Sequence, residues 1–442
     1  MTNFLKSIGF IHLLVAIAML PLQTMLGPSF QILVAPYIAY LVWARNPLYL
    51  PALFVLIAPG STLSIFALLI TLVLTVLYIP KFRTMRLGWL VLLALLPLPV
   101  FIYMTGVRLF GMGMGIVEIL KPLGFYLGLF PFFYGILIAP KIDRRALEGI
   151  LLTFLILPLL KFMPLVEFSI RAYWFSFPLF FAFAGAKIFL SKRLKVPFQW
   201  SVLSILFLLF AISFLGIKFT LIFAAFLALF ALFTAVKGYE WLLNLFAKPK
   251  LVILSVALVA VIVSIGSNYS TRNTQLYNVQ ESINYFDPES FWEGLKFKTF
   301  GDRAPIWAGG WALIQEEKMI WPPYKAPSYS FLNYKGSEVE DIEFGIHNIG
   351  LELMRNYGMV VGGVITLTYI LMLIIGPGRF LRNRVNSPYL LLLAATCLGS
   401  GIVGGLVGQY VLMIAFSFIL LSLSGMLFGQ TLMQDMNEGP HA

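Results

Sequence analysis

Uninterrupted apolar runs recur from one end of the chain to the other, and polar residues gather in short clusters between them. Most runs are about 20 residues long, which suits an α-helix that crosses the roughly 30 Å hydrocarbon core of a bilayer. Because runs such as Leu221–Leu232 lack the period-two alternation of barrel strands, we predict an all-α polytopic membrane protein with 12 to 14 transmembrane helices. The run 47–60 is short and interrupted by Pro51, and it fits either a span or a re-entrant piece. The predicted spans cover residues 8–26, 29–44, 47–60, 61–79, 87–105, 122–140, 147–165, 172–190, 198–215, 219–236, 251–267, 356–376, 388–406 and 409–428.

One long polar segment, residues 268–355, interrupts the apolar pattern. It divides the chain into a transmembrane helical bundle over residues 1–267, a large loop over residues 268–355, and C-terminal transmembrane helices over residues 356–442. Early in the loop, the proline and serine of Phe286–Trp292 predict a turn that leads into a short helix. The loop is the only part of the chain with the polarity of a water-exposed structure, so we expect the function to depend on it.

Further short elements are predicted in the second half of the loop. Asp302 fits an N-cap and Pro305 fits the first turn of an amphipathic helix. The proline-rich stretch 321–327 predicts an irregular loop, and the acidic run 338–343 predicts a solvated surface. His347 stands just before a helix that we expect to enter the membrane. One face of the amphipathic helix is predicted to carry Ile306, Gly309, Gly310, Leu313 and Ile314.

Composition and charge support the membrane interpretation and fix an orientation. Only 11% of the 442 residues are charged and 60% are hydrophobic, whereas soluble domains carry about 25% charged residues. The net charge of +12 does not indicate nucleic-acid binding, because residues 268–355 hold 12 of the 19 acidic residues but only 8 of the 31 basic ones. Such an imbalance is typical of basic cytoplasmic loops and an outer acidic loop.

The basic clusters all fall on one side of the predicted membrane. Two predicted spans separate each cluster from the next, so all five can face the cytoplasm. Both termini are then cytoplasmic, and the loop lies on the periplasmic side of a bacterial inner membrane. The clusters are Lys81, Arg83 and Arg86; Lys141, Arg144 and Arg145; Lys192, Arg193 and Lys195; Lys237, Lys248 and Lys250; and Arg379, Arg382 and Arg384.

A few cations on the outer side run against the positive-inside bias and therefore need another reason. Arg108, Arg171 and Lys218 lie at the outer ends of predicted spans, and Arg303 and His347 lie in the loop. Arginine binds phosphate with two parallel donors, and histidine is the natural general base near neutral pH. These residues suggest a phosphate-bearing substrate and an acceptor that loses a proton. The structural alternatives are that Lys218 snorkels to the interface, that Arg303 is a surface charge, and that His347 caps or packs a helix.

Other chemistries find no support in the sequence. His347 has no second histidine or cysteine at metal-ligand spacing, and no Asp-x-Asp pair is present, so no metal is predicted. Phosphate loops of the Gly-x-x-x-x-Gly-Lys type and Gly-x-Ser-x-Gly elbows are also absent, and no cofactor is predicted. Cys397 is the only cysteine, which rules out a disulfide within the chain, and its apolar surroundings indicate a small hydrophobe.

The second half of the loop resembles the superfamily of O-antigen ligases and O-antigen polymerases. The resemblance rests on Arg303-x-x-x-Trp307, followed by His347–Asn348-x-x-Leu351–Glu352 and then Tyr357–Gly358. It implies a GT-C-like bundle and an inverting, metal-independent glycosyltransferase that uses an undecaprenyl-diphosphate-linked glycan at the periplasmic face. It also implies that Arg303 binds the diphosphate and that His347 activates or orients the acceptor hydroxyl, with Lys218, Arg171 and Arg108 as further cations for the diphosphate. For Arg171 and Arg108 a structural role is equally compatible.

Two departures from the family pattern bear on the subtype. Lys218 stands where the family has an arginine, and Trp321–Tyr324 replaces a glycine-rich turn. We therefore expect a polymerase of O-antigen or exopolysaccharide repeat units. The alternatives are an O-antigen ligase that transfers the glycan to lipid A-core and, from another class, a flippase of lipid-linked oligosaccharide. The expected partners are the lipid-linked glycan, a glycan or lipid-linked acceptor, membrane lipids and other polysaccharide-assembly proteins, without nucleic acid.

Overall fold

The computed structural model describes the two ends of the chain and part of the loop, and nearly all of it is helical. The described residues are 2–57, 62–111, 123–124, 126–157, 304–322, 330–332, 338–340, 348–382, 390, 393–394, 397 and 410–438. The spans predicted over 172–190, 198–215, 219–236 and 251–267, and the turn and helix predicted from residue 286 onward, lie outside these residues.

Where residues of a predicted span are described, most of them are helical. The N-terminal elements are α1 (Thr2–Leu5), α2 (Ile8–Trp43), η1 (Pro47–Tyr49), α3 (Leu50–Ile57), α4 (Thr62–Leu77), α5 (Ile79–Thr84), α6 (Gly88–Leu95), α7 (Leu98–Gly106), η2 (Val107–Gly111), α9 (Pro131–Ile138), η3 (Ala139–Lys141) and α10 (Arg144–Ile156). The later elements are α17 (Ala304–Glu316), β1 (Ser330–Leu332), β2 (Glu338–Glu340), α19 (Ile349–Arg382) and α21 (Tyr410–Glu438). β1 and β2 pair antiparallel, with Phe331 opposite Val339, so part of the acidic run forms a strand.

Two helical segments in the described part of the chain are long and apolar enough to cross a membrane. They are Gly88–Gly106 and Gly350–Phe380. Shorter apolar helices cover Ile8–Leu22, Ile32–Trp43, Pro47–Ile57, Leu63–Leu77 and Ser417–Met433. By length and composition, this supports an association with a membrane.

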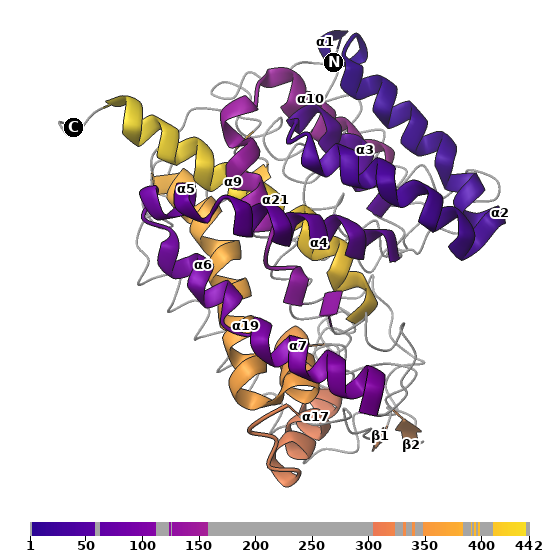
Figure 1. Ribbon diagram of the computed structural model, residues 1–442, viewed down its shortest axis with the longest axis vertical. Helices are drawn as coiled ribbons and strands as arrows, with labels where there is room; N and C mark the ends of the chain where they lie inside the picture. The colour runs from indigo at the N-terminus through magenta and orange to yellow at the C-terminus, as the bar shows by residue number, and fades with distance from the viewer. Residues whose placement is uncertain are drawn as a thin grey trace, which may run out of the picture.

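The helical run α2 folds back on itself. His12 Nδ1 lies 2.7 Å from the Tyr37 hydroxyl, and the His12 and Tyr49 rings are 4.4 Å apart. A straight helix of 25 residues would separate residues 12 and 37 by about 37 Å, so the run consists of two arms packed together. The arms can be followed in Figure 1, beside α3, and they match the two helices predicted over 8–26 and 29–44.

Helix α19 also contains a reversal, which the sequence did not predict. Gly358 has φ 77° and ψ 165°, which is not helical. A β-carbon on Gly350 would lie 3.3 Å from Thr366 Cγ2, and one on Gly362 would meet the backbone of Leu353. The segment Ile349–Tyr357, here called the short arm, is therefore turned back against the segment from Met359 to Arg382, here called the long arm. The long arm is still long enough for one membrane crossing of about 20 residues.

The fold-back of the short arm can be tested by a cross-link. In a Cys397→Ala background, Gly350→Cys with Thr366→Cys is expected to form a disulfide under mild oxidation. The 3.3 Å between the Gly350 β-position and Thr366 Cγ2 puts the two sulfurs within bonding reach. Gly350→Cys with Gly378→Cys is the control, because nothing lies within 4 Å of the Gly378 β-position. A straight helix through residue 358 would leave both pairs unlinked on gel analysis.

Small residues allow α9, α19 and α21 to pack closely. β-Carbons on Gly135 and Gly425 would overlap the backbone carbonyls of Ser422 and Phe132, which belong to the facing helices α21 and α9. Gly425 and Gly429 are four residues apart and so share one face of α21, as in helix pairs of membrane proteins. Hydrogen bonds join the same helices. Ser424 Oγ donates to Met372 O (2.6 Å), and Gln430 Nε2 donates to Ala139 O (2.6 Å).

We expect Gly425→Ala to destabilise this helix packing. Its methyl group would overlap the Phe132 carbonyl, and relief requires the whole backbone of α9 to move. Overpacking of this kind costs about 1–3 kcal/mol. The measurement is thermal unfolding in detergent, with Gly106→Ala as the control because the β-position of Gly106 faces open space. Equal stability of the two variants would contradict the packing of α9 against α21.

The described charges separate towards two ends of the molecule. Aromatic contacts join the basic segments: Phe82 of α5 packs on Phe133 of α9 at 5.2 Å, and Arg379 lies over the Phe428 ring, itself 5.9 Å from Phe132. η3 and α10, with their own cations, come directly after α9. Figure 1 shows α17, β1 and β2 at the opposite end, beside the end of α7. Among the described residues, the loop elements thus lie away from the basic segments.

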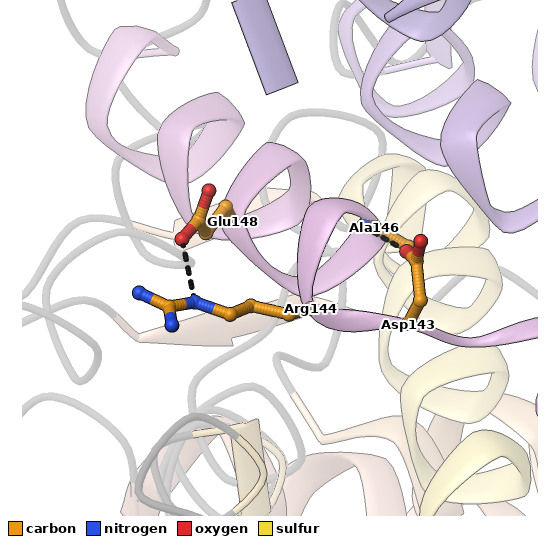
Figure 2. A network of polar contacts seen from close by, with 4 residues as sticks. All are labelled: Asp143, Arg144, Ala146 and Glu148. Carbon is orange, nitrogen blue, oxygen red and sulfur yellow. Dashed lines mark hydrogen bonds and ion pairs between the residues drawn. The ribbon is translucent and has the colours of Figure 1, made fainter. Parts of the chain in front are cut away.

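The start of α10 belongs to the basic end and is locally well defined (Figure 2). Asp143 caps the helix by accepting a hydrogen bond from Ala146 N at 2.9 Å. Arg144 Nε lies 3.0 Å from Oε1 of Glu148, which is buried and one turn further along the helix. This ion pair is a useful reference for a second pair in the loop region.

Candidate functional site

Most residues predicted for the site lie outside the described part of the chain. These are Arg171, Lys218, Arg303 and His347. Arg108 lies in η2, a π-helical turn that continues α7, and only its backbone is described. That these residues act together on one diphosphate-linked substrate stays a prediction. The structure does describe the segments that come directly after Arg303 and His347, and these segments define the candidate site.

Helix α17 comes immediately after Arg303. It begins at Ala304 with Pro305 in its first turn, which confirms the helix predicted here. Its buried face differs in part from the predicted one. Trp307 and Ile314 are buried, whereas Leu313 is only half-buried. Trp307 lies one turn after Arg303, and its buried indole Nε1 has no hydrogen-bond partner among the described residues.

The residues that directly follow α17 are hydrogen-bonded to the start of the long arm, next to the reversal in α19. Met359 N donates to Met319 O at 2.7 Å, and Val360 N donates to Ile320 O at 3.2 Å. These are the first amides of the long arm, which have no partner within their own helix. A β-carbon on Gly358 would overlap the Trp321 backbone. The helix after Arg303 and the short arm after His347 therefore end at the same junction.

The short arm begins directly after His347 with a capped first turn. Asn348 Oδ1 accepts hydrogen bonds from Gly350 N (3.0 Å) and Leu351 N (3.2 Å). An asparagine in this role satisfies amides that the helix leaves free. The prediction that His347 precedes a helix is confirmed. This helix begins the apolar segment Gly350–Phe380, which is long enough to cross a membrane, and the chain reverses within that segment at Gly358.

A buried polar cluster occupies one side of the short arm. Glu352 Oε2 lies 3.1 Å from Arg355 Nη2, with side chains 3% and 13% exposed. Asn356 Nδ2 donates to Glu352 O (2.7 Å) and lies 3.5 Å from Glu352 Oε2. Sequence reasoning places Glu352 only within the family motif and assigns no role to Arg355. The sequence signal for this ion pair was a pair of opposite charges three residues apart, just before an apolar run.

Aromatic side chains connect the junction to α7. The Phe101 ring lies 4.3 Å from both the Tyr126 ring and the Tyr357 ring, and it is stacked on Tyr126 at 19°. All three side chains are buried. The Tyr126 hydroxyl has no hydrogen-bond partner among the described residues. This contact brings α7, whose continuation carries Arg108, to the base of the short arm.

The described part of the site offers neutral donors, a buried ion pair and two helix N-termini. Within the described residues, no cluster of three histidine, cysteine or acidic side chains is placed to hold a metal ion. Helix N-termini carry a partial positive charge that favours anions such as phosphate. Comparison of the chain with protein-family models, with curated proteins and with solved structures finds no match to any of them.

Proposed function

We propose that this chain is an inverting, metal-independent glycosyltransferase of a bacterial inner membrane, which polymerises O-antigen or exopolysaccharide repeat units on undecaprenyl diphosphate. The observation that carries the proposal is the shared junction at Gly358. The helix after Arg303 and the short arm after His347 both end there, held by the bonds from Met359 and Val360 to α17. A cation and a base that directly precede two helices fixed to one junction suit the transfer of a diphosphate-linked group.

The proposed reaction needs no metal. The acceptor hydroxyl attacks the anomeric carbon, a new C–O bond forms, and the bond to the diphosphate oxygen breaks as undecaprenyl diphosphate leaves. His347 takes the hydroxyl proton. Arg303 and Lys218, with Arg171 and Arg108 as further candidates, stabilise the negative charge that develops on the leaving group. Trp307 Nε1, a buried donor one turn from Arg303, is suited to an oxygen of the same substrate.

The proposed topology is a bundle of 12 to 14 transmembrane helices with both termini in the cytoplasm and the loop in the periplasm. Two apolar helices of sufficient length support it, as does the separation of α5 and α10 from α17 and the strands. The basic end then faces the cytoplasm. The long arm crosses the membrane, and the short arm lies at the periplasmic side of the bundle.

The product formed in a strain that lacks the gene tests this function. A polymerase is expected to leave single repeat units on the acceptor core. A ligase would leave a bare core and lipid-linked polymer, and a flippase would leave lipid-linked oligosaccharide on the cytoplasmic side. Gel analysis of the surface glycan, with radiolabelled lipid-linked intermediates as the second measurement, separates the three. Normal polymer length and amount would overturn the proposal.

A further inference from the structure

Arg45 lies just after the second arm of α2 and carries a charge that no described carboxylate balances. Its guanidinium lies over the Tyr78 ring, at 4.9 Å from the ring centroid, and donates through Nη1 to the Tyr78 hydroxyl. Among the described residues Arg45 has no ion-pair partner, whereas Arg144 and Arg355 each contact a carboxylate. Its side chain is half-buried. A permanent charge that is partly removed from water and held by neutral groups attracts an anion from outside the protein.

The guanidinium of Arg45 also has donors that the described residues do not use. Nη1 is occupied by Tyr78, but Nε is buried without a hydrogen-bond partner. Nε and Nη2 form the side-on edge of a guanidinium, whose two parallel donors match two oxygens of a phosphate. The Tyr134 hydroxyl, on which the charge of Arg45 acts, is likewise buried without a partner among the described residues. The surroundings of Arg45 therefore lack an acceptor, and a phosphate would supply one.

Exposed apolar side chains line the two helices that meet at this contact. Helix α2 packs against α4, and the contact between Arg45 and Tyr78 joins their ends. Helical spacing places the exposed side chains on one face of each helix. They are Leu33, Tyr40 and Trp43 on α2 and Leu69, Val73, Val76 and Leu77 on α4. Tyr40 and Trp43 lie within two turns of Arg45, as aromatic residues do at the level of lipid headgroups. A free phosphate would not use these faces, but a phospholipid would contact both.

We infer that Arg45 binds the phosphate of an anionic phospholipid whose acyl chains lie along the exposed faces of α2 and α4. The lipid supplies the counter-charge that Arg45 lacks and oxygens for its side-on edge. Tyr78 holds the guanidinium in place from the other side. Basic sites between membrane helices recognise anionic headgroups in this way. The site uses neither Arg303 nor His347, so it is independent of the proposed function.

The chain contains a matched control for Arg45 in Arg86. Each arginine directly follows the C-cap of a helix and has a positive φ, 49° for Arg45 and 58° for Arg86. Arg45 N donates to Val42 O (3.1 Å), and Arg86 N donates to Arg83 O (3.0 Å). Arg86, however, is exposed. Asparagine tolerates this backbone conformation, so an Arg→Asn change removes one charge at either position without new backbone strain.

The experiment is thermal unfolding of the purified full chain in detergent, titrated with phosphatidylglycerol. The melting temperature of the wild type and of Arg86→Asn should rise saturably, because the lipid binds the folded chain. Arg45→Asn should need about 10-fold more lipid for half the rise, since it loses charge-assisted hydrogen bonds to the phosphate. Arg45→Lys should fall between them, because lysine lacks the side-on edge. Phosphatidylcholine, which has no net charge, should have a smaller effect, and inorganic phosphate should have none.

The comparisons between variants and between ligands decide the inference. Equal lipid dependence of Arg45→Asn and Arg86→Asn would reduce the effect to general charge and overturn the site. An equal rise with phosphatidylcholine would overturn the anionic headgroup, and a full rise with inorganic phosphate would overturn a lipid as the occupant. If Arg45→Asn does not fold, native mass spectrometry of bound phosphatidylglycerol compares Arg45→Lys with Arg86→Lys. Less retained lipid in Arg45→Lys alone supports the site, and wild-type retention in both overturns it.

Discussion

Gly358→Ala is expected to lower the free energy of unfolding by about 3 kcal/mol or more and to abolish the fold-back of the short arm. With φ 77° and ψ 165°, Gly358 occupies a backbone region that is essentially restricted to glycine. Its β-position also overlaps the Trp321 backbone, which cannot rotate away as a side chain would. Backbone strain and steric overlap therefore act together at this residue.

The effect of Gly358→Ala is measured by thermal unfolding in detergent and by the disulfide between positions 350 and 366. Gly378→Ala in the same helix is the control. No atom lies within 4 Å of its β-position, and alanine favours a helix more than glycine does, so stability should be equal or slightly higher. If Gly358→Ala retains both the wild-type melting temperature and the cross-link, the reversal at this residue is wrong.

In the described part of the chain, apolar patterning predicts where helices lie, because an apolar helix needs only a long run of hydrophobic residues. The two helices predicted over residues 8–26 and 29–44 agree with the fold-back of α2, in which His12 Nδ1 lies 2.7 Å from the Tyr37 hydroxyl. The start of α17 followed from a local signal, the proline at residue 305 in its first turn. These features depend on neighbouring residues, which a sequence displays directly.

The reversal at Gly358 was not predictable in the same way. Glycines also occur inside α19 at Gly362, Gly363 and Gly376, where the backbone stays helical. Gly358 is distinguished by the tertiary contact with Met319–Trp321, some 40 residues earlier in the chain. The burial of Trp307 and of the polar side of the short arm likewise depends on segments that are distant in the sequence. The site residues Arg303 and His347 remain predictions from the motif, since the structure describes the helices next to them and not these two residues.

Replacing His347 with alanine is expected to reduce glycan transfer by about 100-fold to 10,000-fold, because the acceptor hydroxyl loses its general base. Arg303→Ala should cause a loss of similar size, and Arg303→Lys should recover only part of it, since lysine lacks the two parallel donors. The measurement is the initial rate of transfer from lipid-linked repeat units by purified protein. Arg145→Ala, which removes an exposed cation at the basic end, is the control and should retain wild-type rate.

Which activity the variants lose, the joining of repeat units or their translocation, distinguishes the proposed enzyme from the flippase. An enzyme requires both variants to fail to join repeat units even though the lipid-linked units still reach the periplasm. A flippase would instead lose translocation when an outer cation is removed, while an added polymerase still joins the units that reach the periplasm. If glycan assembly stays at the wild-type rate with Arg303→Ala and with His347→Ala while translocation fails, the chain moves its substrate rather than transforming it.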